Sequence, residues 1–465
     1  MRTSIMLWRG AASTQTARMP QPKIRKVAAL AMAFVFGVTG TVLHPGASLA
    51  AGMCFQPPVK YASGYNPMSL FSVDLNMNGF PDLSVINNFN SSSYYGFSLL
   101  WNTGEGKFPT RAEGSAGSQP YSVAYGDFDN DGCLDLAVAN VYSANISVMK
   151  GNCKGGFESP KNFAVGQHPH DLVASDLNKD GWVDIAVANG FSDNCTILLN
   201  NKDTGIAFST TTYPAGDGSH NLVAADLNGD GYDDLAIANY NTNFVTILLN
   251  NGDGTFAASP DYVVGTAPYS VVARDLDGDG DSDLAIAMVQ GGIPGSVAIG
   301  MNYGNGSFAT PVSYPVLVDP MSVVTADLDM DNDPDLAVAN GGSDSISVLV
   351  NNGSGAFPST IHVPVGYRQG DIVASDLDRD GDDDLAVTCP STDSVLVLAS
   401  CVSTCEPVIV LDRGADLNCD GIAGDVFDVI AAIDIAFGGG VIPPCAVTDR
   451  GMPTRFTGGY SAPPR

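Results

Sequence analysis

The sequence predicts an all-β protein in which seven four-stranded antiparallel sheets form the blades of a β-propeller. Three observations lead to this prediction. An aspartate-rich segment recurs seven times at intervals of 49–53 residues, which is the signature of a repeat array. Each copy runs into short segments rich in β-branched residues and Asn-Gly turns, without a helical period. Seven such units fall within the roughly four to eight blades that propellers use.

The fourth copy shows the expected strand order most clearly. One strand over residues 221–225 leads into the acidic loop, and a second over residues 235–239 leaves it. A third strand over residues 245–249 ends in an Asn-Asn-Gly turn, after which Phe256 begins a weaker fourth strand. Short connections of this kind join antiparallel strands. Each repeat therefore predicts one blade.

The two ends of the repeat region predict how the ring closes. The seventh copy has a third strand, residues 394–398, but no fourth strand after it, whereas a matching segment over residues 55–61 precedes the first copy. We expect this segment to complete the last blade. Cys54 would then lie beside Cys401 or Cys405. A disulfide there would close a loop of nearly the whole domain, which stabilises by roughly 4–5 kcal/mol on a chain-entropy argument.

The acidic loops predict metal binding. Oxygen-bearing side chains stand at positions one, three, five and nine of each loop, and glycine stands at position six in all but one. Such side chains can surround one hard cation, and calcium accepts roughly six to eight oxygen ligands in flexible geometry. We therefore predict calcium as the cofactor, in a structural role, because position nine begins the second strand. The predicted ligands are Asp74, Asn76, Asn78 and Asp82; Asp127, Asp129, Asp131 and Asp135; Asp176, Asn178, Asp180 and Asp184; Asp226, Asn228, Asp230 and Asp234; Asp275, Asp277, Asp279 and Asp283; Asp327, Asp329, Asp331 and Asp335; Asp376, Asp378, Asp380 and Asp384.

The seven loops are not expected to bind equally. Asn76 and Asn78 replace two carboxylates in the first loop, so it should bind most weakly, since affinity rises with ligand charge. The sixth loop has Asn332 where the others have glycine, and asparagine is the best substitute for a left-handed backbone. A merely solvated acidic turn is the alternative for each loop.

Composition limits the partners. The chain has 465 residues and a net charge of −29. Its acidic residues are 46 Asp and 4 Glu, and this excess of aspartate indicates that the aspartates have a local role. Without residues 1–50 the net charge becomes −35. The negative electrostatic field of so acidic a chain disfavours nucleic acid and anionic membrane surfaces as partners.

The N-terminus predicts export. Basic residues precede an apolar run over residues 27–43, and small residues end the segment near Ala50, so residues 1–50 are predicted to be a signal peptide. A retained membrane anchor is the alternative. The mature chain is expected outside the cell or on its surface, without a membrane span. All nine cysteines lie beyond residue 50, which is consistent with an oxidising compartment, and their odd number leaves at least one unpaired.

A second set of residues is expected to surround the central channel, on the face opposite the calcium loops. These residues stand six positions before the first Asp of each loop and are Met68, Tyr121, His170, His220, Tyr269, Met321 and Gly370. We predict that Tyr121, His170, His220 and Tyr269 contact a ligand. The alternative is that they plug the channel. Two histidines are weak evidence for a transition metal.

The segment after residue 400 is predicted to be separate. Residues 401–415 are predicted as a linker, 416–440 as a calcium-type loop and helix, and 441–465 as a disordered tail. The predicted calcium ligands of that loop are Asp416, Asn418 and Asp420.

Two resemblances follow from these motifs. The run Gly126-Asp127-Phe128-Asp129-Asn130-Asp131-Gly132, followed by Leu136-Ala137-Val138-Ala139-Asn140, resembles the FG-GAP (VCBS) repeats that build the seven-bladed propeller of integrin α subunits. The likeness covers most of residues 54–400. It implies calcium bound through side chains one, three, five and nine and the backbone oxygen of position seven. Residues 416–440 resemble half of a type I dockerin, which implies a cohesin partner, although position nine is Gly424 and the acid expected at position twelve comes one residue late, as Asp428.

Two classes of function fit this sequence. The first is a non-catalytic binding or adhesion scaffold for a protein or glycan, and a purely structural surface-layer component would differ only in lacking a specific ligand. The second is a polysaccharide hydrolase or lyase component carried by the dockerin-like tail. The chain has no G-x-S-x-G or H-E-x-x-H motif, and cation binding accounts for the aspartate clusters. We predict a scaffold without catalytic residues rather than an enzyme.

Overall fold

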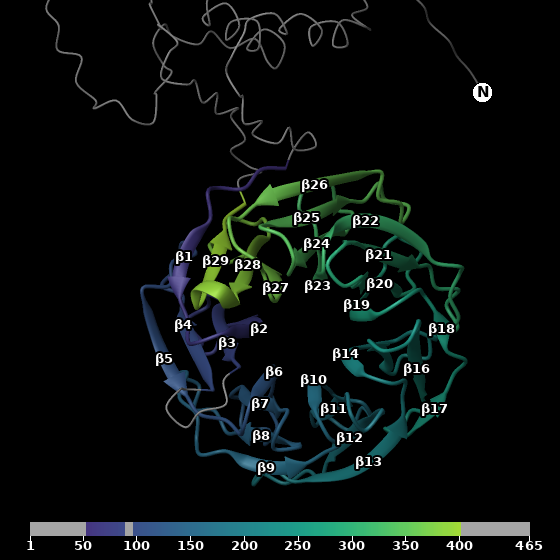
Figure 1. Cartoon of the computed structure of the whole chain (residues 1–465). Coiled ribbons are helices and arrows are strands. Elements are labelled where there is room, and N and C mark those ends of the chain that lie inside the picture. The colour runs from purple at the N-terminus through teal and green to yellow at the C-terminus, as the bar shows by residue number, and fades with distance from the viewer. Residues whose placement is uncertain (1–52, 89–95, 401–465) are drawn as a thin grey trace, which may run out of the picture. The chain divides into compact units, whose positions relative to one another are not determined.

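The computed structural model describes residues 53–88 and 96–400, and these residues form a ring of seven antiparallel sheets around a central channel (Figure 1). In each blade the strand nearest the channel is followed by strands placed successively further out. The predicted all-β propeller is therefore confirmed. The predictions for residues 1–50, 401–415, 416–440 and 441–465 lie outside the described residues.

The first four blades follow the chain in order. Blade 1 consists of β2 (Pro67–Val73), β3 (Asp82–Asn87), β4 (Phe97–Trp101) and β5 (Thr110–Gly114). Blade 2 consists of β6 (Pro120–Gly126), β7 (Asp135–Asn140), β8 (Asn145–Met149) and β9 (Lys161–Ala164). Blade 3 consists of β10 (Pro169–Ser175), β11 (Asp184–Asn189), β12 (Asn194–Asn200) and β13 (Phe208–Pro214). Blade 4 consists of β14 (Ser219–Ala225), β15 (Asp234–Asn239), β16 (Phe244–Asn250), β17 (Phe256–Ala258) and β18 (Tyr262–Val263).

The remaining blades complete the ring. Blade 5 consists of β19 (Pro268–Arg274), β20 (Asp283–Met288), β21 (Pro294–Gly300) and β22 (Val312–Val318). Blade 6 consists of β23 (Pro320–Ala326), β24 (Asp335–Asn340), β25 (Ser345–Val350) and β26 (Ser359–Pro364). Blade 7 consists of β27 (Ile372–Ser375), β28 (Asp384–Cys389), β29 (Ser394–Leu398) and β1 (Val59–Ala62). A 3-10 turn, Pro390–Thr392, is the one helical element among the described residues, and none of them forms a helix able to span a bilayer.

Blade 4 departs from the predicted four strands. Its outer strand is divided into β17 and β18, which both pair with β16, so the sheet counts five strands. Pro260 lies in the gap between them. Proline has no N–H to donate to a sheet, so it interrupts the pairing of an outer strand.

The ring closes as the sequence predicted. Strand β1 pairs with β29, with Val59 opposite Val397, and the Gln56 N–H donates to the Ala399 carbonyl at 2.8 Å. The N-terminal segment thus supplies the fourth strand of the last blade. The predicted disulfide from Cys54 to Cys401 or Cys405 involves residues outside the described range.

The core consists of layers between neighbouring blades. The second strand of every blade is buried along its whole length, so both of its faces must find apolar partners. In β11, Ile185 and Val187 pack toward Ala137 and Ala139 of blade 2. Its other face, with Ala186 and Ala188, packs toward Leu235 and Ile237 of blade 4. Small alanines on one face admit the larger side chains of the next blade, so the alternation in the D-L-A-V-A-N motif sets the spacing between sheets.

Candidate metal loops and central channel

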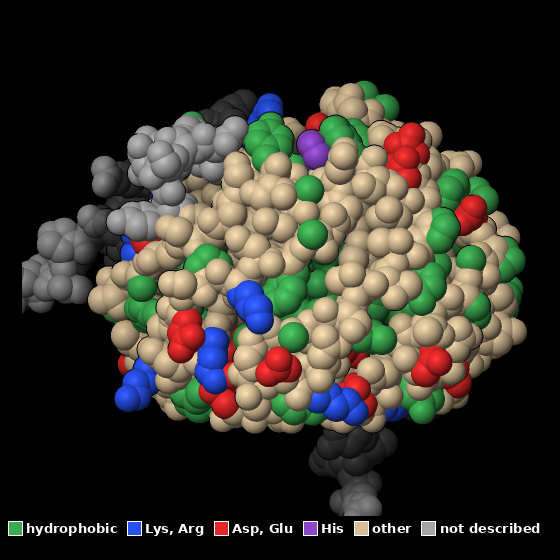
Figure 2. All heavy atoms as spheres, turned by 90° about the horizontal axis from the view of Figure 1, so that it is seen from below, with side chains coloured by type: hydrophobic (Ala, Val, Ile, Leu, Met, Phe, Trp, Pro, Cys, Tyr) green, Lys and Arg blue, Asp and Glu red, His purple; other side chains and the backbone are tan. Residues whose placement is uncertain are grey.

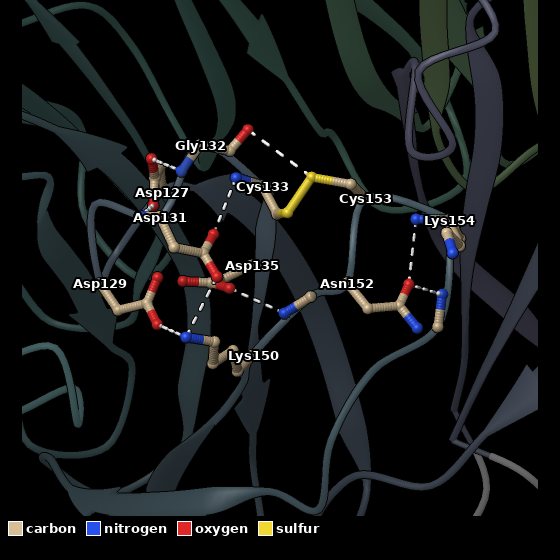
Figure 3. Close-up of a disulfide and its surroundings, with 12 residues drawn as sticks. Asp127, Asp129, Asp131, Gly132, Cys133, Asp135, Lys150, Asn152, Cys153 and Lys154 are labelled. Carbon is tan, nitrogen blue, oxygen red and sulfur yellow. Dashed lines mark hydrogen bonds and ion pairs between the residues drawn. A yellow bond between two sulfur atoms is a disulfide. The ribbon is translucent and has the colours of Figure 1, made fainter.

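Each acidic loop joins the first two strands of its blade and is held by its own carboxylates. In the second loop the Asp131 N–H donates to Asp127 Oδ1 at 3.0 Å, and the Gly132 N–H donates to Asp127 Oδ2 at 2.8 Å (Figure 3). Position six adopts a left-handed backbone, with φ of 89° at Gly132 and 71° at Asn332. The expectation that asparagine replaces glycine there for its backbone is therefore confirmed.

The aspartate at position nine joins the loop to the third strand. In blade 3, Asp184 Oδ1 accepts the Asn200 N–H at 2.7 Å, and its Oδ2 accepts the Leu177 N–H at 3.1 Å. The same two contacts recur in all seven blades. These carboxylates are almost completely buried, and burial raises the pKa of Asp184 to about 7 from an ordinary value of 3.8. Burial likewise raises the pKa of Asp234 to about 6.

Four loops bring three carboxylates together. In each group, one oxygen atom of every member lies within 4.8 Å of the others. The groups are Asp127, Asp129 and Asp131; Asp275, Asp277 and Asp279; Asp327, Asp329 and Asp335; Asp376, Asp378 and Asp384. The first, third and fourth loops carry asparagine at position three and form no such group among the described residues. Groups of three carboxylates thus occur in the second, fifth, sixth and seventh loops.

Three buried oxygen atoms in these loops test whether a cation fits. Asp129 Oδ1, Asp329 Oδ1 and Asp376 Oδ1 are inaccessible to solvent and accept no hydrogen bond. A buried carboxylate oxygen without a donor is costly, and a bound cation would compensate it. Carboxylate and amide oxygens are also the ligands that calcium prefers. The residues present therefore fit the predicted ion.

The first loop is arranged differently. The Asn76 amide donates to Asp82 Oδ2 at 2.9 Å, whereas Asn78 Oδ1 accepts the Phe80 N–H at 2.8 Å as the position-five oxygen does in the other loops. The Asn76 amide thus occupies an oxygen atom of Asp82, so fewer oxygen atoms remain for an ion. This geometry supports the prediction that the first loop binds calcium most weakly.

The second loop contains a cation of its own. The Lys150 ammonium pairs with Asp129, and with Asp131 Oδ2 at 3.1 Å (Figure 3). The hydrogen bond to Asp129 is the main cause of the raised pKa of Lys150. The other blades place an apolar residue at the equivalent position: Trp101, Leu199, Leu249, Met301, Val350 and Ala399. The sequence analysis missed Lys150, although its exchange for an apolar residue in one repeat was visible.

A disulfide also distinguishes the second loop. Cys133 at position seven pairs with Cys153 in the turn between β8 and β9 (Figure 3). Cys195 and Cys389 are buried free thiols. The bond attaches this loop to the outer half of its own blade.

A repeated asparagine, also missed in the sequence, connects neighbouring blades. Asn250 Nδ2 donates to the Asp233 carbonyl of its own blade at 2.9 Å and to the Leu177 carbonyl of blade 3 at 2.7 Å. Asn102, Asn200, Asn302 and Asn351 make the equivalent pair of bonds. Gly151 and Ser400 occupy this place in blades 2 and 7. The asparagine ending the third strand of most repeats was the available signal.

The predicted ring around the channel is present. All seven residues six positions before the loops line a cavity of about 70 Å³ at the centre of the blades. In blades 1 to 6 the pairing register shifts around this position, so it is the extra residue of a β-bulge. Bulges redirect side chains. The irregularity explains why this residue and the one after it both line the channel.

The four predicted ligand-contacting residues touch one another. The Tyr121 hydroxyl lies 3.2 Å from His220 Nε2 and 3.2 Å from the Tyr269 hydroxyl. The rings of His170 and His220 lie 4.9 Å apart. Burial lowers the pKa of His170 to about 4 and of His220 to about 3, so both imidazoles are neutral near pH 7. Contact with a ligand stays a prediction, and the mutual packing supports the alternative that these rings fill the channel.

The residues five positions before each loop form a polar belt that the sequence analysis missed. Asp171 Oδ2 accepts the Leu222 N–H of the next blade at 3.1 Å, and Asn221 Oδ1 accepts the Val271 N–H at 2.7 Å. Burial raises the pKa of Asp171 to about 6. The belt consists of Ser69, Ser122, Asp171, Asn221, Ser270, Ser322 and Asp371. A small polar residue at this place in every repeat was the signal.

The loop geometry agrees with a family comparison. A model of the FG-GAP-like repeat matches residues 74–138, 176–237, 226–286, 275–338 and 327–387, which together make up more than half of the chain. The chain belongs to the FG-GAP-like repeat family. Every FG-GAP-like match begins at the first aspartate of one loop and ends in the second strand of a following blade. The family assignment therefore includes all seven loops. No curated protein matches the sequence.

Three solved structures that are similar to this FG-GAP-like protein have low sequence identity to it. A lectin from Agrocybe aegerita that recognises non-reducing terminal N-acetylglucosamine is 17% identical, with a TM-score of 0.44, over 68% of this chain and 83% of the lectin. A putative 6-phosphogluconolactonase from Bacteroides uniformis is 15% identical, with a TM-score of 0.48, over 64% and 98%. A catalytically inactive virginiamycin B lyase from Staphylococcus aureus is 13% identical, with a TM-score of 0.47, over 75% and 99%. At these values they carry no functional argument.

Proposed function

We propose that this protein is a secreted, calcium-stabilised propeller that acts as a non-catalytic binding or adhesion scaffold for a protein or glycan. The observation that carries the proposal is that the carboxylates at position nine of the loops are engaged in holding the backbone. Both oxygen atoms of Asp184 accept backbone hydrogen bonds, as do those of its equivalents in the other loops. The unpartnered buried oxygen atoms nearby suit an ion rather than a substrate. The Cys133–Cys153 disulfide suits an oxidising compartment.

The alternative, a polysaccharide hydrolase or lyase, has less support. Glycoside hydrolysis needs two carboxylates facing the bond that breaks. The two carboxylates of the channel, Asp171 and Asp371, accept N–H groups from neighbouring blades instead. Docking to a cohesin through residues 416–440 is a separate proposal, and its residues lie outside the described range.

Two measurements test the proposal. The calcium-free protein should melt many degrees below the native protein, and calcium should restore the melting temperature better than magnesium. Equal melting temperatures with and without a chelator would remove the calcium part. Turnover assays on polysaccharides should show no released product. Product formation that tracks the purified protein would favour the enzyme.

A further inference from the structure

We propose that an arc of exposed aromatic side chains on blades 2, 3 and 4 binds a neutral glycan chain. The inference rests on the proposed binding function and names its ligand class and site. The arc is formed by Tyr142, Phe191 and Tyr240, which follow the second strands of their blades. Because the second strand starts at the metal loop and runs away from it, these residues lie at the opposite rim. Figure 2 shows hydrophobic side chains and a histidine at the upper rim of the ring, with most charged side chains of that view lower down.

The three side chains are exposed although they are aromatic. The exposed fractions are 56% for Tyr142, 67% for Phe191 and 39% for Tyr240. Large apolar side chains gathered on a surface mark interaction sites more often than chance. Three in a row on consecutive blades, at nearly the same place in each repeat, form a surface rather than scattered exceptions.

Buried and half-buried rings connect the exposed ones. The Phe191 ring stacks on His168 with centroids 3.6 Å apart and planes 14° apart, and the Tyr142 ring lies 5.9 Å from the same histidine. His168 continues to His170 at 6.1 Å. Tyr240 lies 6.4 Å from His220, which is 4.9 Å from His170. The exposed rings therefore stand on a continuous aromatic base, so a ligand would order few additional side chains.

The charge of the surrounding loops selects the ligand. Segments 115–119, 141–144, 165–168, 190–193, 215–218 and 240–243 contain no Lys, Arg or Glu. Burial lowers the pKa of His168, so its imidazole is also neutral near pH 7. An anionic glycan would need basic groups that these segments lack. A neutral glycan needs aromatic faces for its C–H surfaces and acceptors for its hydroxyls.

Fixed acceptors lie between the rings. Asp193 Oδ1 accepts the Gly218 N–H at 3.2 Å, and Asp217 Oδ1 accepts the Asn241 amide at 2.9 Å. Each hydrogen bond joins neighbouring loops or strands and orients a carboxylate beside the arc. Hydrogen bonds from sugar hydroxyls to ionised acceptors are stronger than those to neutral ones. The rings of Tyr121, His170, His220 and Tyr269 pack against one another at the channel, so the chain would lie across the blades.

The test uses affinity electrophoresis and calorimetry on the calcium-loaded protein. The neutral probes are cellohexaose, chitohexaose, laminarin, xyloglucan and galactomannan, and the anionic probes are heparin and polygalacturonate. At least one neutral probe should bind. Tyr142→Ala, Phe191→Ala and Tyr240→Ala should each weaken binding about tenfold, and the triple variant should abolish it. Tyr303→Ala is the matched control, since Tyr303 is 65% exposed in the turn after β21 on the opposite rim, and it should leave the dissociation constant unchanged.

The outcomes separate this inference from the proposed function. Binding of a neutral probe that the triple variant retains would overturn the arc but keep the binding scaffold. Binding of anionic probes alone, of a protein alone, or of no probe would overturn the neutral glycan as ligand. Release of new reducing ends from a bound probe would overturn the non-catalytic function and leave the arc as a substrate site.

Discussion

Asp371 Oδ2 accepts the Leu70 N–H at 2.9 Å, although the two residues are 301 positions apart in the chain. This bond joins the last blade to the first on the channel side. Strand β1 joins the same two ends of the ring on the outer side, where it pairs with β29. Asp171 and Asn221 make similar bonds between other neighbouring blades. The Asp371 bond is therefore part of the polar belt and is not peculiar to the place where the ring closes.

The first prediction concerns this belt. Asp371→Ala removes the acceptor of both the Leu70 and the Ile372 N–H groups and should lower the free energy of unfolding by about 1–3 kcal/mol. Asp371→Asn keeps one acceptor oxygen, so its free energy of unfolding should lie between that of Asp371→Ala and that of the unmodified protein. Urea unfolding measures both, with the exposed Asp261→Ala as control. If Asp371→Ala matches the control, the belt does not stabilise the ring.

The second prediction concerns the asparagine between blades. Asn250→Ala leaves the buried Leu177 carbonyl and the half-buried Asp233 carbonyl without this donor, so the protein should lose about 1–3 kcal/mol of unfolding free energy. The neighbouring Asn251→Ala is the control, because its exposed amide bonds only the Thr255 hydroxyl of the same turn. Equal losses of unfolding free energy in the two variants would show that the contact between blades stabilises the protein no more than an exposed hydrogen bond does.

The third prediction concerns pH. The position-nine carboxyls, such as Asp184 and Asp335, have pKa values raised by burial to about 6 or 7 from 3.8. A group that binds protons more tightly when folded stabilises the protein most below its unfolded pKa, and loses that effect as pH rises through its folded pKa. The calcium-free protein should therefore melt at a higher temperature at pH 5 than at pH 8. The calcium-loaded protein should show the reverse, since calcium binds the ionised form.

Differential scanning calorimetry at the two pH values checks these opposite pH dependences. It compares the calcium-loaded protein with protein freed of calcium by chelation and gel filtration. Repeating it at high salt is the control, because salt screens surface charges but not the buried carboxyls. Two curves that move in the same direction with pH would contradict the assignment of these carboxyls to the ion.

The fourth prediction concerns Lys150. Replacing it with leucine, the residue at this place in blades 3 and 4, removes an ammonium that competes with calcium for Asp129 and Asp131. Lys150→Leu should make the chelated protein less stable and should increase the stabilisation that calcium provides. Calcium titration followed by thermal unfolding measures both effects.

Lys202→Leu is the matched control, because Lys202 pairs with the single carboxylate of Asp180 at 3.3 Å in the third loop. It should change both quantities less. If the two variants behave alike, Lys150 is an ordinary surface ion pair.

The sequence by itself determined the features that follow from a single loop or from a comparison of the repeats. The period showed seven blades, and the position-one aspartates hold loops of nine residues, so their partners are close in the chain. The left-handed backbone at Asn332 and the completion of blade 7 by residues 55–61 were also readable, because each follows from one repeat compared with the others.

Only the tertiary structure decided which residues from separate strands and loops meet, both between repeats and within one. Asn250 reaches Leu177, 73 positions away, and Lys150 reaches Asp129 and Asp131 of the loop before it. The stacking of Phe191 on His168 likewise depends on two separate loops of one blade. Hydrophobic periodicity specifies which face of a strand is buried but not the partner across a gap. That partner is chosen by the spacing and rotation of packed sheets.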